Sequence, residues 1–323
     1  MTEAPRTHGA APAPKRILIT GWEGFVGRHL TAALAAAWPD ATLLTAPVDV
    51  RDAAAVAAWV SQGAPDICVH LAAVASVPAA AEAQDLAWQV NLHGTLNVAR
   101  AILAAAPSCQ LLFASSADAY GESFRAGGAL DEGALLAPMN VYGATKAAAD
   151  LALGSMVPFG LRVVRLRLFN HIGAGQSPTY AVASFARQIA RIEAGLQPPV
   201  LQVGNLETFR DFVDVRDVCA AYVACIEHRA KLAPGAIFNI ASGAARRMAD
   251  VVAALLEMSH VQVELQSTQL RARGTDIMRA CGDATRARDL LGWMPAISWP
   301  DTLRSVLIDW RSRVGEEQNS LKI

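Results

Sequence analysis

Residues 16–37 read R-I-L-I-T-G-W-E-G-F-V-G-R-H-L-T-A-A-L-A-A-A, and this stretch decides the fold. Its opening residues form a short apolar run that stops at Gly21. Apolar residues with helical spacing then follow from Phe25 to Ala37. The sequence therefore predicts a strand, a tight turn and a helix.

Three glycines, Gly21, Gly24 and Gly27, occupy the predicted turn. The first permits the tight turn, the second lets a pyrophosphate approach the backbone, and the third packs the helix on the strand. Three glycines alone are a weak signal, because ordinary turns also use glycine. Their place between a strand and a helix favours a dinucleotide-binding loop.

The same alternation of strand and helix continues along the chain. Strands are predicted near residues 42–45, 66–71, 110–114 and 161–166, and helices near 52–61, over a long stretch that ends at 105, and after 140. Strands that alternate with helices pair in parallel through right-handed crossovers. The expected fold class is therefore α/β, with a Rossmann-type doubly wound parallel sheet covered by helices on both faces.

This rhythm breaks after Phe169, where Gly and Pro become frequent among the predicted helices. We expect this part to form a smaller substrate lobe, interleaved with the sheet, over the carboxyl ends of the strands. The predicted limits are a flexible leader over 1–14, an NAD(P)-binding domain over 15–168 to which 214–240 return, a substrate-binding lobe over 169–213 and 241–316, and a tail over 317–323.

Composition argues against several classes of function. The 323 residues carry a formal net charge of −1 with scattered Lys and Arg, which argues against nucleic acid or an anionic membrane as a partner. No apolar run reaches the ~20 residues of a membrane helix, and the N-terminal residues lack the apolar core of a signal peptide, so we expect a soluble cytoplasmic protein. The five cysteines form no C-x-x-C pair, which favours buried thiols and predicts no metal site.

Tyr142 and Lys146 lie four residues apart in N-V-Y-G-A-T-K, on one face of a predicted helix. A fixed ammonium beside a phenol lowers the pKa of the phenol from ~10, so the pair suits acid/base chemistry. Ser116 ends the run L-L-F-A-S-S, where the carboxyl edge of the sheet delivers its hydroxyl to the cofactor crevice. Because a Y-x-x-x-K pair also arises by chance, the three residues count only together.

Two further segments join this set, V-H-L-A-A around His70 and W-Q-V-N-L-H-G-T around Asn91. In order and spacing, the glycine loop, H-L-A-A, Asn91, S-S-A-D-A-Y-G and Y-x-x-x-K resemble the extended short-chain dehydrogenases, the NAD-dependent epimerase/dehydratase family, over nearly the whole chain. The resemblance implies an NAD(P)-dependent oxidoreductase. In it, Ser116 hydrogen-bonds the reacting oxygen, Tyr142 exchanges its proton, and Lys146 binds the nicotinamide ribose while tuning the phenol. The resemblance also implies that Asn91 holds a helix and a water of the proton relay. A structural role in capping or packing explains the presence of Asn91 and His70 equally well.

The predicted cofactor contacts combine the glycine loop and the catalytic pair with positions that the resemblance supplies, such as Asp49 and Val50 at the adenine. They are Gly21, Gly24, Phe25, Val26, Arg28, Asp49, Val50, Leu71, Ala72, Ala73, Asn91, Tyr142, Lys146 and Leu168. The strand that discriminates NAD from NADP ends T-L-L-T-A-P, with neither an acidic nor a basic side chain. Arg28 is either a ligand of the 2′-phosphate or an exposed helix arginine. NADP(H) is favoured, and NAD(H) stays open.

The second half of the chain contains two motifs that are more specific than the glycine loop. They are R-L-F-N-H-I-G-A-G-Q at 167–176 and V-G-N-L-E-T-F-R-D-F-V-D-V-R-D-V at 203–218. These segments resemble the GDP-4-keto-6-deoxy-D-mannose reductases. The resemblance implies a GDP-linked sugar, reduced at its 4-keto group to GDP-D-rhamnose, which supplies lipopolysaccharide. A nucleotide diphosphate needs directional donors and cationic forks. The predicted substrate-binding residues are Asp118, Asn170, Arg187, Asn205, Arg210 and Arg273. Leu168 and Gly274 depart from the relatives, which carry proline there, and bear on the nicotinamide pocket and a substrate loop.

Two other functions stay open. A dehydratase or an epimerase retains NAD(P) and recycles it within one turnover; Asp118 stands where dehydratases often carry Glu, but Ala117 and Ala119 beside it leave no adjacent second carboxylate. A non-catalytic Rossmann sensor or scaffold needs only the binding loop, whereas this chain keeps the whole catalytic set. The resemblance further implies a homodimer that pairs the helices before Ala105 and after Tyr142.

Overall fold

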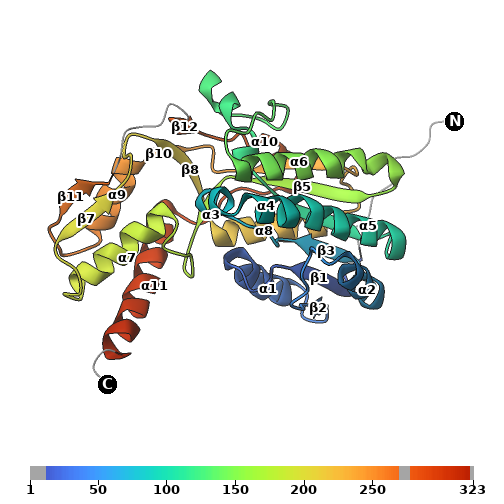
Figure 1. Cartoon of the computed structure of the whole chain (residues 1–323), viewed down its shortest axis with the longest axis horizontal. Helices are drawn as coiled ribbons and strands as arrows, with labels where there is room; N and C mark the ends of the chain where they lie inside the picture. The colour runs from blue at the N-terminus through green and yellow to red at the C-terminus, as the bar shows by residue number, and fades with distance from the viewer. Residues whose placement is uncertain (1–11, 269–276, 321–323) are drawn as a thin grey trace.

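A computed structural model gives the structure of residues 12–268 and 277–320. Its centre is a sheet of six parallel strands in the order β2-β1-β3-β4-β5-β9 (Figure 1). These strands are β1 (Arg16–Thr20), β2 (Thr42–Leu44), β3 (Ile67–His70), β4 (Gln110–Ser116), β5 (Arg162–Leu168) and β9 (Ala236–Ile240). Every residue of β3 and β4 is buried, as expected for strands covered on both faces. The predicted Rossmann-type α/β fold is confirmed.

The strand order reverses beside β1. The chain runs from β1 outward to β2 and then crosses back to β3 on the other side of β1, where Leu18 pairs with Cys68. In open parallel sheets, the crevice outside the carboxyl ends of the strands at such a reversal binds ligands. The glycine loop after β1 and the segments after β3 and β4 therefore meet at one crevice.

Helices cover both faces of this sheet. One face packs on helices α1 (Phe25–Ala37), α8 (Val215–Glu227) and α10 (Thr285–Leu291). The opposite face packs on α2 (Ala53–Gly63), α5 (Thr95–Ala105) and α6 (Val141–Ser155). Apolar residues at helical spacing make the contact, for example Leu30 and Leu34 of α1, both fully buried. All five cysteines are buried and free, which confirms the expected buried thiols.

The long helix expected to end at Ala105 is instead interrupted. The structure divides it into α3 (Val77–Glu82), α4 (Gln84–Trp88), a π turn over Gln89–Gly94, and α5. The π turn contains Asn91, whose side chain holds the backbone of Val74 through two hydrogen bonds. Val74 N donates to Asn91 Oδ1 at 2.8 Å, and Asn91 Nδ2 donates to Val74 O at 3.2 Å. Single π turns inside helices are frequent at functional sites. A π turn contains one residue more than an α-helical turn. The spacing of apolar residues, taken with α-helical periodicity, does not reveal it.

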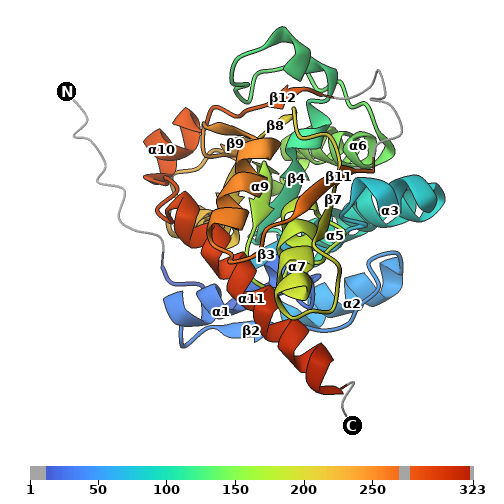
Figure 2. The same cartoon turned by 90° about the vertical axis from the view of Figure 1, so that its left-hand side faces the viewer.

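The second lobe is built around strand β8 (Phe209–Asp214). Strand β8 pairs with β6 (Asn170–Ile172), β10 (Ala245–Arg247) and β12 (Arg279–Ala280), and a separate pair joins β7 (Val200–Val203) to β11 (Glu264–Ser267). Helices α7 (Ala181–Glu193), α9 (Met248–Glu257) and α11 (Trp299–Ser320) pack together beneath these strands (Figure 2). This lobe lies beyond the carboxyl ends of the central strands.

Helix α11 continues to Ser320, so residues 317–320 of the predicted tail are helical. The domain limits themselves stay a prediction. Within the residues that the structure describes, no helix combines the length and the apolar character that crossing a bilayer requires.

Candidate active site

The glycine loop leaves room for a ligand close to the backbone. Gly21 has φ +67°, and a Cβ on it would lie 2.7 Å from Ala72 N. A Cβ on Gly27 would lie 2.4 Å from Gly21 O and 2.5 Å from Trp22 O, which are backbone atoms that cannot swing away. Helix α1 begins after Gly24 with no side-chain cap, so its first amides point into the crevice without a side-chain acceptor. This cradle fits the pyrophosphate of a dinucleotide.

Replacing Gly27 with Ala is therefore expected to weaken binding of a dinucleotide such as NADPH by about 10- to 100-fold, because overpacking costs about 1–3 kcal/mol and each 1.4 kcal/mol is tenfold. Titration calorimetry with NADPH measures the effect. Gly315→Ala is the matched control, because it lies within helix α11 with no neighbouring atom within 4 Å of the new Cβ. Unchanged affinity in the Gly27 variant would show that the loop does not hold the dinucleotide.

His70 is a structural residue at the end of β3. Thr95 Oγ1 donates to Asn91 O at 2.7 Å, so it accepts from His70 Nε2 at 2.9 Å. The other ring nitrogen, Nδ1, then accepts from Thr20 Oγ1 at 2.7 Å. Burial lowers the pKa of His70 to about 3, so the ring is neutral and both nitrogens are used inside the protein. The geometry therefore favours a packing role for His70.

The predicted adenine contacts lie beyond β2. Asp49 forms an ion pair with Arg51 at 2.6 Å, and the hydrogen bond from Arg51 lowers the pKa of Asp49 to about 2. Val50 is buried against Gly94, where a Cβ would lie 2.6 Å from Val50 Cγ2. The segment 71–73 follows β3 directly, and Leu71 N and Ala72 N donate to Thr20 Oγ1 at 3.2 and 3.1 Å.

Arg28 lies one residue after the glycine loop, beside Phe25 and Val26 at the start of α1. Its Nη1 donates to Glu23 O at 2.7 Å and its Nη2 to Gly175 O at 3.3 Å. The guanidinium thus bridges the glycine loop to the second lobe. Whether it also contacts a 2′-phosphate stays a prediction.

The catalytic set assembles where β4 meets the start of α6. Ser116 is the last residue of β4, and Leu168, the last of β5, is its register partner. Asn140 caps α6 by accepting from Gly143 N at 2.7 Å. A Cβ on Gly143 would lie 2.5 Å from Asp118 O, so the glycine lets α6 approach the turn after Ser116. Tyr142, the second residue of α6, thereby lies close enough to Ser116 and Asp118 for both to influence the pKa of its phenol.

The expected effect of Lys146 on Tyr142 is wrong for this structure. Burial, together with the charge of Asp118, raises the pKa of Tyr142 above its usual value, and the hydrogen bond from Ser116 only partly opposes this. Lys146 Nζ instead donates to Ala114 O at 2.9 Å, and burial lowers its pKa to about 8. Lys146 is not among the groups that shift the pKa of Tyr142, whereas desolvation is the largest cause. The phenol is therefore held in its protonated form, which is the form that donates a proton.

Asn91 positions rather than reacts. Besides holding Val74, its Nδ2 donates to Thr145 Oγ1 at 2.9 Å, and Thr145 Oγ1 donates to Tyr142 O at 2.8 Å. Thr145 lies between the two catalytic residues of α6 in sequence. The buried Asn91 amide therefore ties the segment after β3 to the helix that carries Tyr142 and Lys146.

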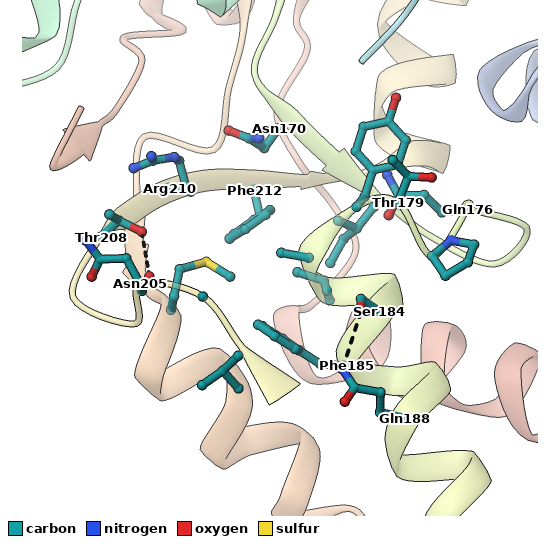
Figure 3. A pocket seen from close by; sticks show the side chains of 18 of the residues that line it. Asn170, Gln176, Thr179, Ser184, Phe185, Gln188, Asn205, Thr208, Arg210 and Phe212 are labelled. Carbon is teal, nitrogen blue, oxygen red and sulfur yellow. Dashed lines mark hydrogen bonds between the residues drawn. The ribbon is translucent and has the colours of Figure 1, made fainter. Parts of the chain in front are cut away.

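A cavity of about 490 Å³ lies in the second lobe, next to this set (Figure 3). Three of the predicted substrate residues, Asn170, Asn205 and Arg210, line it. Arg210 also faces Asp118, since its charge lowers the pKa of that carboxyl, which burial raises overall. The cavity and the catalytic set therefore share one electrostatic environment.

One predicted substrate residue, Arg187, lies away from the cavity. Arg187 does not line the cavity described here; its guanidinium lies 6.0 Å from the ring centre of Trp310 on α11. Arg187 precedes the cavity-lining Gln188 directly, and neighbouring residues of a helix project about 100° apart, so Arg187 lies on the face of α7 that packs on α11. Arg273 lies outside the described residues.

Sequence reasoning missed Tyr180, His171 and Gln176, which also line the cavity. Tyr180 donates its hydroxyl to Ala75 O at 3.0 Å, across the boundary between the lobes, and its charge state is coupled to Asp118. His171 and Gln176 stand inside the segment 167–176 that the sequence analysis singled out. Only their polar side chains at a strand end hinted at a site. Within the described part of the chain, no three His, Cys, Asp or Glu side chains gather as they would around a metal ion.

Comparison with known proteins gives a consistent result. Residues 17–241 match the model described as "NAD dependent epimerase/dehydratase family". The chain is 38% identical over 307 residues to GDP-6-deoxy-D-mannose reductase of Pseudomonas aeruginosa, covering 94% of this chain and 99% of the relative. It is 28% identical to GDP-6-deoxy-D-talose 4-dehydrogenase of Aggregatibacter actinomycetemcomitans, with coverage of 86% and 91%. The solved structure of RMD from Pseudomonas aeruginosa complexed with NADPH superposes with a TM-score of 0.85 at 36% identity, covering 93% of this chain and 99% of that one.

Proposed function

This chain belongs to the NAD-dependent epimerase/dehydratase family, and from that premise we propose that it is an NADPH-dependent oxidoreductase that reduces the 4-keto group of GDP-4-keto-6-deoxy-D-mannose to give GDP-D-rhamnose. The observation that supports this most directly is the packing of the start of α6, which carries Tyr142, on the turn after Ser116, together with a second-lobe cavity large enough for a nucleotide sugar. The similarity to GDP-6-deoxy-D-mannose reductase extends over nearly the full length of both chains.

The residues of the crevice fit a dinucleotide, since the glycines make a tight turn directly before the first amides of α1, which have no side-chain cap. When bound, NADPH supplies the hydride for C4 of the keto sugar. Ser116 donates a hydrogen bond to the carbonyl oxygen, and Tyr142 transfers its proton to that oxygen as the alcohol forms. Lys146 holds the ribose hydroxyls with its ammonium. Asn170, Asn205 and Arg210 orient the nucleotide diphosphate, with Asp118 facing the sugar hydroxyls.

The raised pKa of Tyr142 matches this direction of reaction. A phenol with a raised pKa stays protonated at neutral pH, so each turnover begins with the acid form in place. Because burial lowers the pKa of Lys146 and raises that of Tyr142, the ammonium of Lys146 titrates before the phenol of Tyr142 as pH rises.

The rate should therefore fall as pH rises through about 8, the pKa of Lys146, because the ammonium that holds the ribose becomes a neutral amine. A plot of kcat/KM against pH measures this limb. Lys146→Arg is the control: it is slower, but its profile lacks the limb because the guanidinium stays charged. Stability changes in the opposite direction, rising between pH 8 and 10.5, since the folded state binds fewer protons than the unfolded chain there. An alkaline limb that survives in Lys146→Arg would assign it to another group.

The decisive assay mixes the protein with GDP-4-keto-6-deoxy-D-mannose and either NADPH or NADH, and follows loss of the reduced-nicotinamide absorbance. Stoichiometric oxidation identifies the reductase, and the faster cofactor gives its preference. A protein that binds the GDP-sugar but oxidises neither cofactor is not this reductase. Conversion of the sugar without net oxidation would then point to a dehydratase or an epimerase.

We also propose that the enzyme works as a homodimer in the cytoplasm and supplies a sugar for lipopolysaccharide. The dimer is supported by α6, on which Leu151 is 59% exposed, and by Phe159 just beyond it, which is 80% exposed. Five buried free thiols are typical of a reducing compartment. The proposal keeps the cofactor domain over 15–168 with 214–240 and assigns the remaining described segments after 168 to the substrate.

A further inference from the structure

Gln176 is a buried side chain in the cavity wall with one atom unused. It is 3% exposed, and its Nε2 donates to His171 O at 2.8 Å. Its Oε1 finds no hydrogen-bond partner in the described part of the chain. The amide cannot be turned over, because that would place Oε1 against another carbonyl oxygen. The free acceptor is therefore fixed by the fold.

The segment that carries Gln176 is held on two sides. Toward the glycine loop, His29 Nε2 donates to Ala174 O at 2.7 Å, and the rings of Phe25 and His171 lie parallel with centres 6.1 Å apart. Toward the C-terminus, Gly175 N donates to Asp309 Oδ2 at 3.0 Å. Gln176 is thus pinned at the end of the cavity that adjoins the cofactor loop.

The opposite end of the cavity has a different lining. In Figure 3, Gln176 and Thr179 lie across the cavity from Asn205 and Thr208, with Arg210 on the same side as Asn205. The end of the cavity at Gln176 adjoins the cofactor loop through His29 and Phe25, so a hexose that receives hydride from the nicotinamide lies at this end and the base lies farther away. His171 Nδ1 donates to Phe169 O at 3.0 Å, which leaves Nε2 as a second acceptor at this end.

We propose that Oε1 of Gln176 accepts a hydrogen bond from a ring hydroxyl of the bound hexose, so that Gln176 helps to determine which sugar is accepted. This inference rests on the proposed function. A buried acceptor left unpaired is costly, and a ligand donor removes that cost. The diphosphate cannot be the donor because its oxygens are acceptors only. The hexose offers one hydroxyl donor on C3, next to the keto carbon, and one on C2, next to the anomeric carbon.

The test measures binding by titration calorimetry with four probes: GDP, GDP-mannose, and the 2-deoxy and 3-deoxy forms of GDP-mannose. Wild type is expected to bind GDP-mannose about 3- to 10-fold more tightly than one of the deoxy forms, the usual effect of one hydrogen bond. Gln176→Met, which keeps the length of the side chain and removes the acceptor, is expected to lose this discrimination. Its affinities for GDP and for NADPH stay unchanged.

Several outcomes overturn the inference. If wild type binds both deoxy forms as tightly as GDP-mannose, the inference is overturned. This result does not depend on any variant folding. Weaker GDP binding in Gln176→Met places the contact on the nucleotide, and weaker NADPH binding places it on the cofactor. Discrimination that persists in Gln176→Met assigns the hydroxyl to another acceptor. Gln62→Met, the same change on the exposed surface of α2, is expected to alter none of the affinities.

Failure of the proposed function gives a separate signature. If wild type binds neither GDP nor GDP-mannose, the proposed GDP-sugar substrate is wrong, and the inference about Gln176 fails with it. Wild type that binds GDP and GDP-mannose equally well would leave the nucleotide assignment standing while removing a sugar contact for Gln176.

Discussion

Tyr142→Phe is expected to lower kcat for reduction of the keto sugar by about 10²- to 10⁴-fold, the contribution of a positioned general acid. The variant loses only a hydroxyl, whose proton the alkoxide requires as hydride arrives. Burial and the charge of Asp118 hold that proton on the phenol by raising its pKa. Initial rates at saturating NADPH measure the loss, so that a change in cofactor affinity does not enter the result.

The matched control is Tyr222→Phe. Tyr222 lies in α8, is fully buried, and its hydroxyl has no hydrogen-bond partner in the described part of the chain. Removing that hydroxyl costs no interaction, so both activity and folding should be preserved. A Tyr142→Phe enzyme that keeps more than about a tenth of wild-type kcat would mean that another group delivers the proton.

The second large effect is on stability. Asp150 is a fully buried carboxylate on α6 that accepts from Ser115 Oγ at 2.7 Å, from Arg165 Nη1 at 3.1 Å, and from Arg167 through Nε and Nη2, both at 3.1 Å. Asp150→Ala leaves two guanidinium groups in the interior without their counter-ion. The free energy of unfolding is expected to fall by about 3–5 kcal/mol, as when one partner of a buried ion pair is removed. Urea denaturation followed by circular dichroism measures it.

Asp289→Ala provides the comparison. Asp289 pairs with Arg288 at 3.0 Å, but the two side chains are 56% and 53% exposed, so the change should cost at most about 1 kcal/mol. Equal losses in the two variants would contradict a special role for burial at Asp150. Because Asp150 also holds Ser115 next to the catalytic Ser116, its variant should lose activity below its unfolding transition as well.

The sequence by itself determined the fold and predicted the catalytic set. The strand, glycine turn and helix at 16–37 are local, since turn stereochemistry and helical periodicity act over a few residues. The same holds for Tyr142 and Lys146, whose spacing places both on one face of α6. The carboxyl end of β4 positions Ser116 through the general rule for parallel sheets. These features were predictable because each depends on neighbours in sequence or on a topology common to the fold class.

Only the tertiary structure decided how the substrate end is built. The cavity wall is drawn from loops, strands and helices between residues 170 and 268. Packing between these segments placed Arg187 against Trp310 and brought Tyr180 and Gln176 to the wall. The direction of the Tyr142 pKa was likewise beyond the sequence. Desolvation depends on every chain segment that covers a group, whereas a Y-x-x-x-K pair records only one neighbour. Contacts between distant segments set both the cavity and its electrostatics, and no local pattern encodes them.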